Sequence, residues 1–215
     1  MVVTMSTLLA PPAEQRVRLS GISWETYERL LAEHEGRQSP RFTFDRGELE
    51  IMVISFEHEE SNRLLDDLFT TIADERGIDF IDAGSTTLIR KDLDRGFEPD
   101  TGIYIRNAGS IRGKRRLELP RDPPPDLVIE VDITSSSIDK MEIYSAMGVA
   151  EVWRYDAASL RFFTLDGGKY LARNESAVLP GLTSEVASRF LEDAKSEPRN
   201  VWIGKVREWA KAHPA

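Results

Sequence analysis

The chain has 215 residues, of which 40% are hydrophobic and 30% charged, as in an ordinary globular domain. It contains no cysteine, which excludes disulfide bonds, thiolate metal ligands and cysteine nucleophiles. The apolar runs are shorter than the roughly 18 residues of a membrane-spanning helix, so we expect a cytoplasmic protein. The formal net charge of −9 at pH 7 disfavours nonspecific coating of nucleic acid, which depends on cations facing phosphates.

The first part of the chain is expected to contain a leader, a helix and a β-hairpin. Residues 1–20 combine two prolines with polar residues and show no sustained periodicity, which indicates a flexible leader. Ser23 precedes apolar residues at helical spacing and predicts a capped amphipathic helix. Alternating apolar residues on both sides of a turn at 45–47 then predict the hairpin.

A second helix and several short strands are expected to follow. Leu65, Leu68, Phe69 and Ile72 form one helical stripe, which Gly77 ends. Runs typical of strands lie at 78–81, 86–90, 102–105, 126–133, 151–155 and 161–165. Because helices and strands interleave, the sequence predicts an α/β (α+β) domain over residues 21–195, with a mixed β-sheet flanked by helices.

Residues 196–215 are predicted to form a C-terminal amphipathic helix. Trp202, Val206 and Trp209 follow one another at i, i+4 and i+7 and form an apolar stripe that needs a partner surface. Symmetric pairing is the commonest way to cover such a stripe, so we expect a homodimer. Docking of the stripe on its own domain is the alternative.

Carboxylates are the main candidates for chemistry, because Walker-type loops, GxSxG and HExxH motifs are absent and the three histidines are scattered. The run 126–133 alternates strictly and places Val128, Glu130 and Asp132 on one face of a strand. Two carboxylates on a largely apolar face need solvent, a cation or a metal to compensate them. A solvated face with ordinary surface acids is the alternative.

A third acid belongs to the run Glu98-Pro99-Asp100, where the proline fixes the start of a strand and Asp100 lies at the beginning of that strand. A Pro-Asp pair alone is more typical of a turn. Together with Glu130 and Asp132, however, Asp100 would supply the oxygen ligands that Mg²⁺ prefers.

Cations are concentrated between Arg106 and Arg121, where Glu118 is the one nearby acid. This basic segment is expected to supply any contacts to nucleic-acid phosphates, and its candidate residues are Arg112, Lys114, Arg115 and Arg116. A solvated loop without a partner is the alternative.

Several of these features occur together in one order along the chain. The order comprises a hairpin, a helix with His58, Glu98-Pro99-Asp100, Pro125 to Val131, Ser135, Asp139-Lys140, Tyr144, Gly148 to Trp153, and Leu179 to Leu182. Over roughly residues 21–192 this pattern resembles the Uma-type family of putative restriction endonucleases, which belongs to the PD-(D/E)XK nuclease superfamily. The resemblance implies a restriction-endonuclease-like mixed β-sheet flanked by helices, in agreement with the predicted elements.

The resemblance also implies roles for individual residues. By position, Asp100 resembles the aspartate of the motif and Glu130 its acidic strand residue, and this pair would bind a divalent ion together with the Val131 carbonyl. The superfamily's lysine normally lies two residues after the acid, where this chain has Asp132. Lys140 lies in the first turn of a helix, whose side chains lean toward the strand end, and it replaces that lysine in the candidate catalytic set Asp100, Glu130 and Lys140. A solvent-facing lysine is the alternative.

The implied activity is Mg²⁺- or Mn²⁺-dependent hydrolysis of phosphodiester bonds in DNA. Asp132 could complete the metal site, and Glu57 and His58 could form an outer shell. For His58 the alternative is a histidine at the core edge that donates to a carbonyl. A catalytically silent nuclease-fold protein acting in assembly or nucleic-acid binding, and a hydrolase with a small substrate, remain open.

Overall fold

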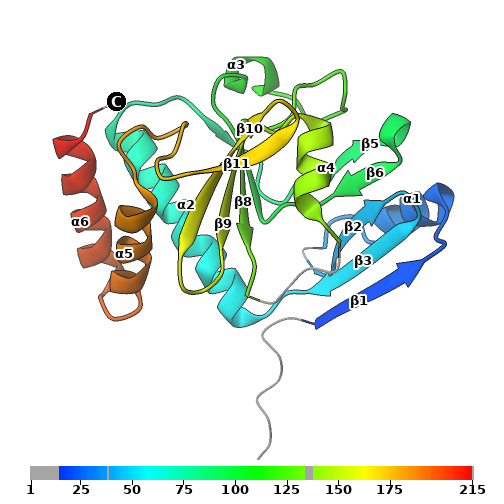
Figure 1. Ribbon diagram of the computed structural model, residues 1–215, viewed down its shortest axis with the longest axis horizontal. Coiled ribbons are helices and arrows are strands. Elements are labelled where there is room, and N and C mark those ends of the chain that lie inside the picture. Colours follow the sequence, from blue (N-terminus) through cyan, green and yellow to red (C-terminus); the bar gives the residue numbers. More distant parts are fainter. Residues whose placement is uncertain (1–14, 38, 134–137, 215) are drawn as a thin grey trace, which may run out of the picture.

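Two β-sheets with helices on their faces make up the part of the chain that the computed structural model describes, residues 15–37, 39–133 and 138–214 (Figure 1). The N-terminal sheet is antiparallel and has the order β1 (Gln15–Ser20), β3 (Glu48–Val53), β2 (Arg41–Asp45), β6 (Arg95–Phe97) and β5 (Leu88–Arg90). The central sheet has the order β11 (Lys169–Arg173), β10 (Leu160–Asp166), β9 (Glu151–Tyr155), β8 (Leu127–Val131), β7 (Thr101–Tyr104) and β4 (Ile81–Asp82). Since β8 and β9 are parallel and the other neighbours antiparallel, the predicted mixed sheet is confirmed.

Capping side chains or a glycine mark several of the helix ends. They are α1 (Trp24–Glu33), α2 (Phe56–Glu75), α3 (Ala108–Ile111), α4 (Lys140–Met147), α5 (Ser184–Ala194) and α6 (Arg199–Ala212), with a short 3₁₀ turn, η1 (Lys91–Leu93). The Ser23 and Ser55 side chains accept hydrogen bonds from first-turn amides of α1 and α2, and Gly148, at φ 83°, ends α4. None of the helices in the described ranges is both long and apolar enough to cross a membrane.

The alternation along β8 determines which layer each side chain joins. Leu127, Ile129 and Val131 are buried in the core that the central sheet forms with α2, α5 and α6. Val128 faces the other way and packs with α4 and its neighbours. Glu130 shares this second face and is only 3% exposed, so the alternative of a solvated face with surface acids is wrong.

The run Glu98-Pro99-Asp100 joins the two sheets, because it follows β6 of the N-terminal sheet and precedes β7 of the central sheet. Helix α4 packs beside the same junction, where Phe97 of β6 and Tyr144 of α4 have ring centroids 4.7 Å apart. Figure 1 shows α4 between the strands of the two sheets. Residues at this junction can therefore receive side chains from both sheets.

The predicted leader is wrong for residues 15–20, which form β1 and pair with β3. Ion pairs hold one face of this strand: Arg16 contacts Glu50 and Arg18 contacts Glu48, each at 2.8 Å. Val17 and Leu19 alternate with these arginines but are exposed (55% and 40%), so charges across the two strands, and not a buried apolar face, stabilise the pairing. Residues 1–14 and the serines at 135–137 lie outside the described residues.

Helix α6 packs on its own chain. Trp202 and Val206 are fully buried against α2 and α5, and the Trp202 indole donates a hydrogen bond to the Phe190 carbonyl at 2.6 Å. Trp209 packs its ring at the edge of Phe190, with centroids 6.0 Å apart. The apolar stripe that motivated the expected homodimer is thus covered within one chain.

We expect Trp202→Ala to lower the free energy of unfolding by about 3–5 kcal/mol, because it leaves a cavity in the core and removes the hydrogen bond from the indole to the Phe190 carbonyl. Urea denaturation followed by circular dichroism measures the loss. Trp209→Ala is the matched control, since that side chain is only partly buried and should cost clearly less. A loss below about 1 kcal/mol for Trp202→Ala would show that α6 contributes little to the fold.

A second stability prediction concerns Asp66 on α2, whose pKa is raised to about 6 by burial and by the charges of Asp82 and Asp67. The folded protein thus holds a proton that the unfolded chain releases, so stability falls as the pH rises from the ordinary value of 3.8 through about 6. The full shift corresponds to about 3 kcal/mol. Partial exposure of the carboxylate reduces our expectation to about 1 kcal/mol.

Asp66→Asn should therefore stabilise the protein at pH 7 and have little effect at pH 4. Urea midpoints measured at both values test this, with Asp74→Asn as the control, because Asp74 lies on the same helix and its side chain is exposed. An equal effect of Asp66→Asn at both pH values would contradict the raised pKa.

Candidate active site

Asp100 and Glu130 are neighbours across two paired strands. The register of β7 and β8 pairs Thr101 with Ile129, and the two acids are the next residues in that register. The backbone amide of Val131 donates a hydrogen bond to Asp100 Oδ2 at 2.7 Å, which fixes the aspartate against β8. Both carboxylates are buried, with exposures of 2% and 3%. The structure therefore brings together the two acids that the sequence placed in one site.

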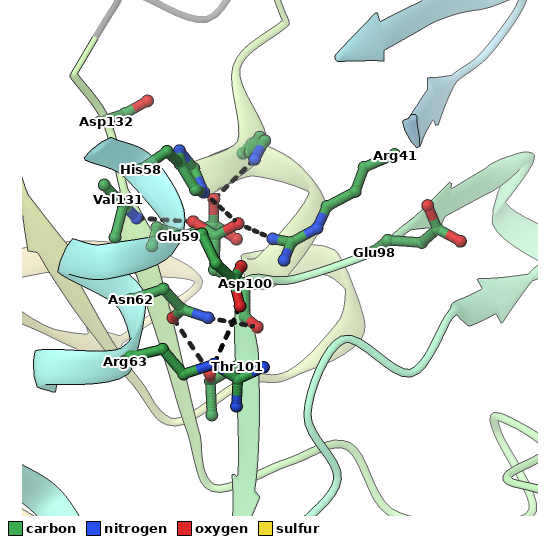
Figure 2. A network of polar contacts seen from close by, with 12 residues as sticks. Arg41, His58, Glu59, Asn62, Arg63, Glu98, Asp100, Thr101, Val131 and Asp132 are labelled. Atoms are coloured by element: carbon green, nitrogen blue, oxygen red, sulfur yellow. Dashed lines mark hydrogen bonds and ion pairs between the residues drawn. The ribbon is translucent and has the colours of Figure 1, made fainter. Parts of the chain in front are cut away.

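The other oxygen of Asp100 faces two basic side chains. His58 Nε2, from the first turn of α2, lies 2.9 Å from Oδ1, and the Arg41 guanidinium forms an ion pair with the same oxygen (Figure 2). Asn62, one helical turn after His58, donates to the Asp100 carbonyl at 3.3 Å and accepts a bond from the Thr101 hydroxyl at 3.1 Å. These contacts fix both the side chain and the backbone of Asp100.

Glu130 is held by two residues of α4. Lys140 Nζ contacts Oε2 at 2.6 Å, and the Tyr144 hydroxyl donates to Oε1 at 2.5 Å. The two residues are four apart, so they share one face of the helix. The Lys140 side chain is 10% exposed, so the alternative of a solvent-facing lysine is wrong. Burial, and then the Glu130 carboxylate, raise the pKa of Tyr144 well above its ordinary value, which keeps its proton in place as a donor.

Arg41, at the start of β2, reaches the site from the N-terminal sheet. Burial lowers the pKa of its guanidinium, while the nearby charges of Glu130, Glu59 and Glu98 raise it. Glu98 accepts hydrogen bonds from the Phe42 amide at 2.8 Å and the Thr87 hydroxyl at 2.9 Å, and its burial raises its pKa. The site thus contains a buried arginine surrounded by acids.

Asp132 is directed toward other cations. Its Oδ2 accepts a hydrogen bond from Arg154 at 2.5 Å, and its Oδ1 lies 3.7 Å from an Arg16 nitrogen. Arg154 is the residue that pairs with Glu130 across β8 and β9. Asp132 therefore lies beside the site, in ion pairs with two arginines.

His58 and Glu57, the two residues predicted to form an outer shell, lie in different places. His58 is fully buried and lies against Asp100, where an outer-shell residue would be. Glu57 is exposed and lines a groove with Tyr155 and Trp202, on the side of α2 that faces α5 and α6. The structure does not bring Glu57 into contact with the two acids.

The basic segment begins at the opposite end of β7 from Asp100, because it follows the end of that strand. Most of its candidate cations are also ion-paired: Arg112 with Asp79, Lys114 with Asp122, and Arg116 with Glu35. The structure therefore does not bring this segment to the acids, and its contact with phosphate stays a prediction.

The acids border two cavities. Glu130, Lys140 and Arg154 line one of about 400 Å³, and Arg41, Asn62 and Asp100 line another of about 310 Å³. Acidic side chains from α2 and β4, Glu59, Asp66 and Asp82, also line the second cavity. Each of the two acids therefore lies beside a separate cavity.

The donor chemistry of the site fits a hard divalent cation, because Asp100 and Glu130 offer carboxylate oxygens from adjacent strands and the carbonyl of Val131 directly follows Glu130. The side chains are now paired with protein cations, and the described residues contain no group of three or more histidine or acidic side chains arranged around one point. A divalent cation bound here would share these carboxylates with the Arg41, His58 and Lys140 side chains that contact them.

Sequence reasoning missed three of the residues that hold the acids: Arg41, Asn62 and Arg154. The helical spacing between His58 and Asn62 was a usable signal, since i and i+4 share a face. The sequence contains no local sign of Arg41, because its partner lies in a different sheet.

Similarity to known proteins identifies the family of the chain. A family model, Uma2, described as putative restriction endonuclease, matches residues 24–192, which is more than half of the chain. No curated protein matches. One similar solved structure is described as a putative nuclease belonging to DUF820 from Anabaena variabilis; it is 12% identical, with a TM-score of 0.49, and the match covers 72% of this chain and 93% of that chain. The resemblance inferred from the motifs is confirmed, and the chain belongs to the Uma2 family of putative restriction endonucleases.

Proposed function

We propose that this protein is a Mg²⁺- or Mn²⁺-dependent endonuclease of the PD-(D/E)XK type that hydrolyses phosphodiester bonds in DNA. The observation that carries the proposal is the pair of buried carboxylates, Asp100 and Glu130, on adjacent strands, with Lys140 bonded to the glutamate. Buried acids are costly unless a cation compensates them, and a nuclease site uses such acids to hold a metal. The family match supports the same activity.

In this mechanism Asp100, Glu130 and the Val131 carbonyl would hold the cation. When bound, a divalent cation lowers the pKa of a coordinated water and neutralises charge on the phosphate. Lys140 keeps a positive charge beside Glu130 and stabilises the negative charge that develops on the phosphate oxygens. Tyr144 holds the second oxygen of Glu130 and so fixes the direction of that carboxylate.

Asp132 and the basic segment have supporting roles in the proposal. Asp132 would contribute a further carboxylate once its pairing with Arg154 is relaxed. The basic segment would contact DNA backbone phosphates away from the scissile bond. A cytoplasmic location is part of the proposal, because DNA is the substrate. We also propose a homodimer, although the apolar stripe of α6 is covered within one chain and gives no support for it. Sedimentation of the full chain tests the oligomeric state.

The proposal is tested by incubating the purified protein with supercoiled, linear and single-stranded DNA in Mg²⁺, Mn²⁺ or EDTA. We expect cleavage with either metal and none with EDTA. Cleavage that is equal in EDTA would contradict the metal requirement. If binding of DNA persists without cleavage in every condition, the protein is the catalytically silent binding protein that the sequence left open.

A further inference from the structure

We propose that Arg41 is an internal counter-cation of the carboxylate site, which holds Asp100 in place and competes with the divalent metal for it. The inference rests on the proposed function and adds a residue from outside the nuclease motif. It predicts that metal binding requires the guanidinium to leave Asp100.

The contacts of Arg41 support this role. Its guanidinium is ion-paired to an aspartate with a fully buried side chain, and the Arg41 side chain is itself 6% exposed. The charges of Glu130, Glu59 and Glu98 are all close enough to act on it. Figure 2 shows the Arg41 side chain directed from β2 toward Asp100, on the side opposite to Asn62. Arginine thus compensates the same acids that a metal would compensate.

A cavity beside Asp100 could receive the Arg41 guanidinium after it leaves the aspartate. The cavity of about 310 Å³ beside Asp100 is lined by Arg41 itself, by Arg63, which is ion-paired to Glu59 at 2.9 Å, and by the acids Asp66 and Asp82. A guanidinium that left Asp100 could therefore remain paired with a carboxylate in that cavity, so its displacement would not leave a buried charge alone. The backbone beside Arg41 could keep its position, because the Phe42 N–H donates a hydrogen bond to the Glu98 carboxylate at 2.8 Å.

Isothermal titration with Mn²⁺ tests the competition. Arg41→Met keeps a long side chain and removes the charge, and we expect it to bind Mn²⁺ at least about tenfold more tightly than the unmodified protein. Arg41→Lys retains the charge and should stay near the original affinity. Arg95→Met is the matched control: Arg95 lies in the same sheet, is 11% exposed and pairs with Asp45 at 2.7 Å, so its loss should leave Mn²⁺ affinity unchanged.

If Arg41→Met is too unstable for titration, thermal melting of the variant and NMR of the unmodified protein still test the competition. Without metal this variant should melt at a lower temperature than the unmodified protein, and Mn²⁺ should raise its melting temperature by a larger amount. In the unmodified protein the ¹⁵Nε signal of Arg41 should shift when Mg²⁺ is added, since the guanidinium leaves Asp100. An unshifted Arg41 signal at saturating Mg²⁺ would overturn the inference.

The outcomes separate this inference from the proposed function. Equal or weaker Mn²⁺ binding by Arg41→Met would overturn the role of Arg41 and leave the metal-dependent nuclease in place. Absence of Mn²⁺ binding in both proteins would overturn both. Tighter binding by Arg41→Met alone, with Arg95→Met unchanged, supports the competition.

Discussion

Asp100→Asn and Glu130→Gln are each expected to reduce DNA cleavage to background and to abolish Mn²⁺ binding. Each change removes a negative charge from the proposed ligand set while keeping the size of the side chain. The remaining carboxylate cannot hold the cation alone, so we expect no measurable binding by titration calorimetry. Plasmid nicking with purified variants measures the loss of activity.

The matched control is Asp126→Asn, at the other end of β8. Asp126 is also a buried aspartate, 2% exposed, and it accepts hydrogen bonds from the Ile105 amide and from Arg106. Its replacement should lower stability but leave cleavage by the folded protein near the original rate. Normal cleavage by Asp100→Asn or Glu130→Gln would place the reaction elsewhere on the molecule.

Lys140→Ala is expected to lower the rate of cleavage by about 10² or more, the scale for removing one electrostatic stabiliser of a transition state. Binding of Mg²⁺ should not weaken, because the variant removes a positive charge and keeps both carboxylates. Single-turnover cleavage at saturating metal separates this effect from a change in metal affinity.

Lys195→Ala is the control for Lys140→Ala. Lys195 forms a lysine–glutamate contact of the same length, 2.6 Å, with Glu192, but on the surface at the end of α5. Its loss should leave the rate unchanged. A rate for Lys140→Ala that equals the rate of this control would remove Lys140 from the mechanism, even though it contacts Glu130.

The helices and strands with a regular spacing of apolar residues could be predicted from the sequence. The strict alternation of β8 indicated the face that carries Glu130, and the capped apolar stripes indicated α1 and α2. Strand β1 was missed because its apolar alternation is limited to Val17 and Leu19, while ion pairs with β3 stabilise the other face. The aromatic stripe of α6 correctly indicated a buried face, but an amphipathic pattern carries no information on whether the partner is the same chain or another.

The candidate site was predictable where residues are linked by a strand or a helix turn. Alternation placed Glu130 on its face of the strand, the family resemblance pointed to Lys140, and the direction of side chains in a first helical turn explained how Lys140 could reach the strand end. Arg41 could not be predicted, because its approach to Asp100 depends on how two sheets dock. Local patterns describe which face a residue occupies within its own element, and they do not describe which element faces it.

The link Glu98-Pro99-Asp100 between the sheets also determines when the site forms during folding. Arg41 reaches Asp100 from the N-terminal sheet, whereas Val131 and Glu130 reach it from the central sheet. Contacts between residues so far apart in sequence form slowly, because loop closure precedes them. Recovery of cleavage during refolding should therefore lag behind the recovery of secondary structure, and it reports the final docking of the two sheets.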